Sequence, residues 1–260
     1  MMKKTKATHR GNGGRRNTSR RTKRAEREPD IPVGKMNFGD LHRFTPLSWN
    51  YGFSRGTPID RYYIERFLSQ YKRDIRGAVL EVEDNSYTQQ FGTNRVRTSD
   101  VLHVSRRHPG ATVIADLTDA PSIVANSYDC VILTQTLQYI YNSRAALATI
   151  HRILRPGGVV LATFPGLSRT SDPLWSDRWY WNFTSRSARR LFEEVFEPKS
   201  VIVKGFGNLF IATAFLYGLA LSEVATTDLE RRDEGFEITI TVRAQKNQLS
   251  SRPSSGRVSP

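Results

Sequence analysis

The sequence is poor in cysteine and has no long apolar run. Its one cysteine, Cys130, excludes an intramolecular disulfide, and its strand-like surroundings predict a buried core thiol. No stretch of about 18 apolar residues occurs, so we expect no membrane span. The basic N-terminus lacks the apolar segment of a secretory signal, and we therefore expect a cytoplasmic protein. Neither cysteines nor histidines have zinc-binding spacing, which argues against a metal site.

Positive charge is concentrated at one end of the chain. The net charge is +14, and residues 1–30 carry 11 Lys and Arg against 3 Asp and Glu. Such a segment cannot bury a core, so we expect residues 1–30 to be a disordered basic tail and residues 247–260 a second disordered tail. The basic tail makes nucleic acid a conceivable partner, but the rest of the chain lacks a dense basic patch and does not favour it.

Between the tails, short apolar runs alternate with helical segments. The runs cover 77–82, 96–101, 111–115 and 128–133, and a helix over 143–154 precedes a fifth run that ends at residue 163. Strands that alternate with helices predict an α/β domain, here over residues 77–246, with a parallel sheet. Phe236 to Arg243 alternates with period two, as an antiparallel strand does. Residues 31–76 are expected to form an N-terminal cap or lid with one helix.

Acidic or polar residues follow several of these runs. Ligands of an open parallel sheet bind beyond the carboxyl ends of its strands, so such residues are expected to point into one cleft. The residues concerned are Glu81, Asp100, Asp116, Thr134 and Gln135.

The order of these motifs resembles that of class I S-adenosylmethionine-dependent methyltransferases, in particular the methyltransferase type 11 group, over about residues 60–243. The resemblance rests on 79–82, 116–119, 128–133, 137–140 and Leu154-Arg-Pro-Gly-Gly158. It implies a Rossmann-like fold, with a mostly parallel seven-stranded sheet, a C-terminal antiparallel strand and helices on both faces. It also implies S-adenosylmethionine as cofactor.

The resemblance assigns roles to the strand-end residues. Glu81 is expected near the methionine ammonium, and Asp100, at the end of the second strand, on the ribose hydroxyls. Asp116 is expected on the adenine amino group, with Leu117 against the ring. Thr134 and Gln135 are expected to line the methyl-transfer region. Glu81 has an alternative reading as an N-cap or a surface acid, and Asp116 as an N-cap with Asp119 in the first turn.

The first loop departs from the family pattern, which has three glycines there. Glu83, Asn85 and Tyr87 occupy those positions. Glycine is favoured in such loops because it accepts positive φ and carries no Cβ. Either the loop has another shape in which Asp84 or Asn85 binds the ammonium, or the cofactor site is degraded.

A loop rich in tryptophan follows the fifth strand, where the family commonly builds its acceptor pocket. Trp175, Arg178 and Trp179 are candidate substrate residues, because aromatic faces stack on sugars and flat rings. Arg55 and Tyr62 are expected to close the cleft as a lid. We therefore expect O-methylation of a small molecule or glycoconjugate, with no catalytic base assigned. The alternatives are an RNA methyltransferase or RNA-binding protein and a non-catalytic scaffold.

Overall fold

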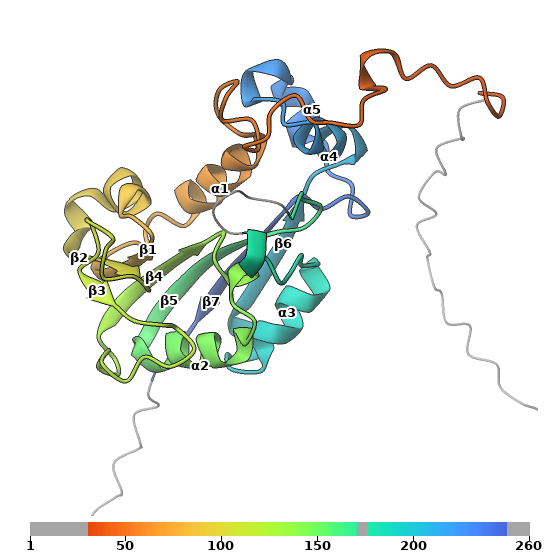
Figure 1. Cartoon of the computed structure of the whole chain (residues 1–260). Coiled ribbons are helices and arrows are strands. Elements are labelled where there is room, and N and C mark those ends of the chain that lie inside the picture. Colours follow the sequence, from red (N-terminus) through yellow and green to blue (C-terminus); the bar gives the residue numbers. More distant parts are fainter. Residues whose placement is uncertain (1–30, 171–175, 249–260) are drawn as a thin grey trace, which may run out of the picture. The chain divides into compact units, whose positions relative to one another are not determined.

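The computed structural model describes residues 31–170 and 176–248 (Figure 1). The chain divides into two units, one up to Arg43 and one from Phe44 onward. The described part of the first unit is mostly irregular, with one helical turn, Gly39–Leu41. All other elements belong to the second unit. The expected tails lie outside the described residues, apart from 247 and 248, and so does Trp175.

Seven strands form one sheet in the order β3-β2-β1-β4-β5-β7-β6. Strand β7 runs antiparallel to both neighbours, and the other pairs are parallel. This confirms the predicted mostly parallel sheet with a C-terminal antiparallel strand. The strands are β1 (Gly77–Val82), β2 (Val96–His103), β3 (Val113–Ile114), β4 (Tyr128–Thr134), β5 (Leu154–Pro165), β6 (Val201–Phe206) and β7 (Thr239–Gln245).

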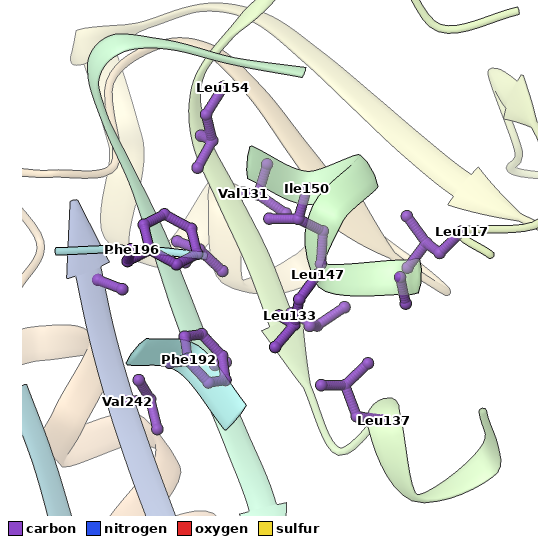
Figure 2. Packing of buried hydrophobic residues seen from close by; sticks show 14 of the residues in the cluster. Leu117, Val131, Leu133, Leu137, Leu147, Ile150, Leu154, Phe192, Phe196 and Val242 are labelled. Carbon is purple, nitrogen blue, oxygen red and sulfur yellow. The ribbon is translucent and has the colours of Figure 1, made fainter. Parts of the chain in front are cut away.

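Helices cover both faces of the sheet. Helices α2 (Ser143–Ile153) and α3 (Ser185–Glu193) pack on one face and lie near each other in Figure 1. Figure 2 shows this packing, with Leu147 and Ile150 of α2 beside Val131 and Leu133 of β4. Helix α1 (Ile59–Gln70) packs on the other face through a second cluster that includes Ile64, Leu68 and the buried Cys130.

A third cluster joins α1 to the last two helices, α4 (Leu209–Leu216) and α5 (Thr226–Glu230). Ile59 and Tyr63 of α1 pack with Ile211 and Phe215 of α4, and the hydroxyl of Tyr63 donates to the carbonyl of Leu229 at 3.0 Å. The segment before α1 is held against this layer by a bridge between Pro58 and Ala220. Residues 51–61 are thereby fixed above the sheet edge where the parallel strands end.

One local prediction was wrong in detail: strand β2 continues to His103, so Asp100 lies inside it. Helix α2 is capped by Asn142, whose side chain accepts from the backbone N–H of Ala145. Helix α2 ends at Ile153, and the Pro-Gly-Gly segment belongs to β5. Among the described residues, no helix is long and apolar enough to cross a membrane.

Candidate active site

A cavity of about 1150 Å³ opens at the carboxyl ends of the parallel strands. Its walls come from the ends of β1, β2, β4 and β5, from residues 51–61 and from residues 178–180. Pockets for one small molecule usually measure about 300–1,000 Å³. The cavity is therefore large enough for a cofactor and an acceptor together.

Most of the predicted cofactor and substrate residues meet in this cavity. Those that line it are Glu81, Asp84, Asp116, Leu117, Thr134, Gln135, Arg178 and Trp179. Asn85 does not line it; its side chain bonds Ser99 at 3.2 Å and Gln89 at 2.8 Å. Residues from four parts of the chain thus converge at the edge that the parallel-sheet argument indicates.

Glu81 organises the glycine-poor loop. Its carboxylate accepts hydrogen bonds from the backbone N–H groups of Tyr87 and Thr88, at 3.2 and 2.7 Å, and from the Thr88 hydroxyl at 2.7 Å. The residue is 2% exposed, and burial raises the pKa of its carboxyl to about 7. The bonds bind the end of β1 to the start of the short π-helix η2 (Thr88–Gly92).

The loop contains a backbone conformation that is normally found at glycine. Glu83 has φ = 79°, in the left-handed region where side chains are rarely found. Asp84 then accepts from the backbone N–H of Ser86 at 2.8 Å and from its hydroxyl at 2.7 Å, which forms a tight turn. Glu81, Glu83 and Asp84 still line the open cavity. The loop therefore leaves room for a ligand although its glycines are absent, and the residues present fit a cofactor.

Asp116 and Leu117 stand just beyond β3. Asp116 accepts from the N–H and the hydroxyl of Thr118, both at 2.8 Å, so one carboxylate oxygen fixes the local turn. Leu117 is 4% exposed and contributes an apolar face to the cavity wall. This pairing of a carboxylate with an apolar wall suits a flat ring that carries an amino group.

The structure places Asp100 away from the cavity. Its carboxylate accepts from the hydroxyls of Thr112 at 2.9 Å and Tyr128 at 3.1 Å, which ties β2 to β4 and to the residue before β3. The apolar pattern of Val101 and Leu102 continues the strand by three residues. His103 therefore occupies the strand end that we had assigned to Asp100, and it lines the cavity.

Arg55 and Tyr62 also differ from the prediction, because neither lines the cavity. The Arg55 guanidinium pairs with both carboxylate oxygens of Glu223. Tyr62 donates to Glu230 at 2.5 Å. Their neighbours Asp60 and Arg61 line the cavity instead.

Sequence reasoning missed Asp60 as a site residue. Its Oδ1 is buried without a hydrogen-bond partner, and desolvation by burial raises the pKa of the carboxyl. The next residue, Arg61, donates to the Tyr87 hydroxyl at 3.3 Å and so links α1 to the first loop. In the sequence, the two charged residues Asp60 and Arg61 directly follow Pro58 and Ile59, which are buried. The simpler interpretation of this pattern was a first helical turn that faces solvent.

Aromatic side chains from three segments form one wall of the cavity. The Trp179 ring stacks on Tyr51, with centroids 6.2 Å apart, and meets Tyr139 edge-on at 5.3 Å. Its indole N–H donates to Asn182 at 2.9 Å, which orients the ring. Trp181, from the same loop, packs against Tyr141 and does not line the cavity.

Comparison with known proteins gives one family match and several structural likenesses. The methyltransferase domain family matches residues 67–162. The fold is similar to that of a SAM-dependent methyltransferase from Archaeoglobus fulgidus, with 11% identity over 72% of this chain and 94% of that one and a TM-score of 0.47. It is also similar to phosphoethanolamine N-methyltransferase 2 of Haemonchus contortus in complex with S-adenosyl-L-methionine, with 14% identity over 81% and 55% of the two chains and a TM-score of 0.48.

A search of curated protein sequences finds no significant match. Both structural likenesses are low in identity, so the assignment follows from the family match and from the order of the strands. The match runs from the last residues of α1 to residue 162 in β5, and it includes the ends of β1, β2 and β4 that line the cavity. These two findings support a class I methyltransferase fold for the α/β domain, with S-adenosylmethionine as its cofactor.

Proposed function

We propose that this chain transfers a methyl group to a hydroxyl oxygen of a small molecule or glycoconjugate. The observation that carries the proposal is the buried, unpartnered Oδ1 of Asp60 in the same cavity as the strand-end residues. An oxygen acceptor must lose its proton at or before attack, and a positioned carboxylate can take that proton.

Asp60 suits the role of general base. Burial raises the pKa of its carboxyl, which brings it closer to the pH at which a base works best. It lies in the first turn of α1, which fixes its backbone and favours a negative charge near the helix N-terminus. A buried carboxylate oxygen without a donor is unfavourable, and an acceptor hydroxyl would supply the missing hydrogen bond.

The aromatic wall supports an acceptor with a flat or sugar-like face. Trp179, Tyr139 and Tyr51 present ring faces and edges from three separate segments. Aromatic rings bury a large apolar area at a defined orientation, and arginine adds hydrogen-bond donors for hydroxyl or phosphate oxygens. Arg61 and Arg178 line the same cavity.

The strand-end residues support the cofactor side of the proposal. When bound, the cofactor supplies an electrophilic methyl group on its sulfonium. Asp116 would accept from the adenine amino group and Leu117 would pack on the ring, while Asp84 would face the methionine part. The protein then contributes mainly alignment of donor and acceptor and removal of the acceptor proton.

Titration calorimetry tests the cofactor part. We expect S-adenosylmethionine and S-adenosylhomocysteine to bind the wild type, and Asp116→Ala to weaken both. Thr118→Val is the matched control, because it removes one hydrogen bond of the same turn and leaves the carboxylate in place. Absence of binding to folded wild-type protein would contradict the proposal and favour the non-catalytic scaffold.

Methyl transfer tests the acceptor part. Purified protein would be incubated with cofactor labelled on the methyl group and with a panel of glycosides, phenols and total RNA. We expect label in a hydroxylated small molecule or glycan, with the product an O-methyl ether by mass spectrometry. Label that enters RNA alone would contradict the proposal in favour of the RNA alternative.

A further inference from the structure

Two histidines and a glutamate converge beside the first loop. Nε2 of His103 lies 3.4 Å from Oε2 of Glu83, and Nε2 of His108 lies 3.6 Å from Oε1. The two imidazoles are stacked, with ring centroids 4.4 Å apart. Glu83 comes from the loop after β1, His103 from the end of β2, and His108 from the turn that follows. One ligand atom from each residue falls within 4.8 Å of the others.

The spacing of the three side chains leaves room for a metal ion between them. Both gaps to Glu83 exceed the length of an ordinary hydrogen bond, about 2.7–3.2 Å, and fall in the range of an ion pair. Zinc binds nitrogen and oxygen at about 2.0–2.2 Å, which puts ligand atoms on a tetrahedron about 3.4 Å apart. The two separations are close to this value, and each imidazole faces a different oxygen of the Glu83 carboxylate.

The Ser105 backbone fixes the His103 ring, with its N–H 2.9 Å and its carbonyl 3.3 Å from Nδ1 of His103. Without a metal, Nδ1 accepts from the N–H and Nε2 carries the hydrogen. A metal on Nε2 would move that hydrogen to Nδ1, where the carbonyl of Ser105 would accept it and the bond from the Ser105 N–H would be lost. Nδ1 of His108 is buried without a partner.

We propose that Glu83, His103 and His108 bind a first-row divalent cation such as Zn²⁺. Two imidazoles and one carboxylate are a donor set that suits this ion. Three protein ligands leave a fourth position open, as in reactive rather than structural zinc sites. Glu83 and His103 line the cavity, so the fourth ligand would be water or an oxygen of a molecule bound there. The proposal does not depend on methyl transfer.

Titration of Zn²⁺ into untagged, chelator-treated full-length protein tests the proposal. We expect one equivalent to bind, and each of Glu83→Gln, His103→Gln and His108→Gln to weaken the affinity at least about tenfold, since loss of an outer partner alone costs that much. Co²⁺ gives an independent readout, because a four-coordinate site produces intense visible bands that an octahedral site lacks.

His151→Gln is the matched control. His151 lies on α2 and packs edge-on against Phe196, and neither residue belongs to the cluster. Its replacement should therefore leave the Zn²⁺ affinity unchanged. Circular dichroism would confirm that each variant is folded. The proposal is overturned if wild-type protein binds neither ion, or if the three cluster variants bind Zn²⁺ as tightly as the wild type does.

Discussion

The carboxylate of Glu81 accepts two hydrogen bonds from Thr88, one from its backbone N–H and one from its hydroxyl, both at 2.7 Å. The Glu81 side chain thus fixes a loop in which the methyltransferase pattern has glycines. The hydrogen bonds give the loop a fixed shape, but they require a carboxyl group to be buried. We expect the burial of this group to make the stability of the protein depend on pH.

We expect Glu81 to make the protein less stable as pH rises. Burial raises the pKa of its carboxyl to about 7 in the folded state, above the ordinary 4.5. Between these values the folded protein holds a proton that the unfolded chain lacks, so stability falls with rising pH, by at most about 3 kcal/mol. Urea unfolding at pH 5 and pH 8 would show a smaller difference for Glu81→Gln. Equal differences in the two proteins would contradict this.

Asp60→Asn is expected to lower kcat about 10²–10⁴-fold, because the variant cannot accept the acceptor proton. Its affinity for S-adenosylhomocysteine should not change. In the wild type, kcat should rise with pH through a pKa above that of an ordinary aspartate, and the variant should lose this limb. Asp233→Asn removes an exposed carboxylate that does not line the cavity, and it serves as control. An active Asp60→Asn enzyme with an unchanged pH profile would rule out the base.

Trp179→Ala is expected to raise the acceptor KM about tenfold, since the stacked ring presents its face to the cavity. The dissociation constant of the cofactor should stay the same. Trp181→Ala is the comparison, because Trp181 belongs to the same loop but packs outside the cavity on Tyr141. Equal effects of the two substitutions on KM would show that the loop, and not the Trp179 face, matters.

Arg243→Met is expected to destabilise the fold by about 1–2 kcal/mol, because it leaves the Asp74 carboxylate without its partner. The guanidinium donates to both oxygens of Asp74, at 2.7 and 3.2 Å, and ties β7 to the turn after α1. Urea unfolding would measure the loss. Arg97→Met breaks a pair at 3.4 Å whose arginine is 73% exposed, and should cost less than about 0.5 kcal/mol. Similar losses would contradict the difference in burial as the cause.

Much of the fold could be predicted because the apolar periodicity is strong. Strands β1, β4 and β7 and helix α2 lie within a few residues of their predicted ranges. Errors arose where the same pattern continues past a polar residue. Asp100 reads as a strand end, but Val101 and Leu102 are buried and extend β2 to His103. An isolated polar residue in an apolar run does not decide where a strand stops.

The cavity was harder to predict, because its walls come from segments that are distant in sequence. Asp60 joins it because the first turn of α1 lies beside the ends of the strands, and no local sequence pattern indicates that placement. His103 and His108 were set aside as zinc ligands, which was wrong on spacing, since four residues separate them as in many zinc sites. Glu83 lies twenty residues before His103. Parallel pairing of β1 with β2 brings their ends together.

The aromatic wall and the strand-end residues of the cavity come from different parts of the fold. Tyr51, Tyr139 and Trp179 sit on connecting segments, whereas Glu81 and Thr134 sit on the strands themselves. Substitutions on the connecting segments can therefore accumulate without disturbing the sheet. Such substitutions would change the acceptor that is methylated, while the strand-end residues would continue to bind the same methyl donor.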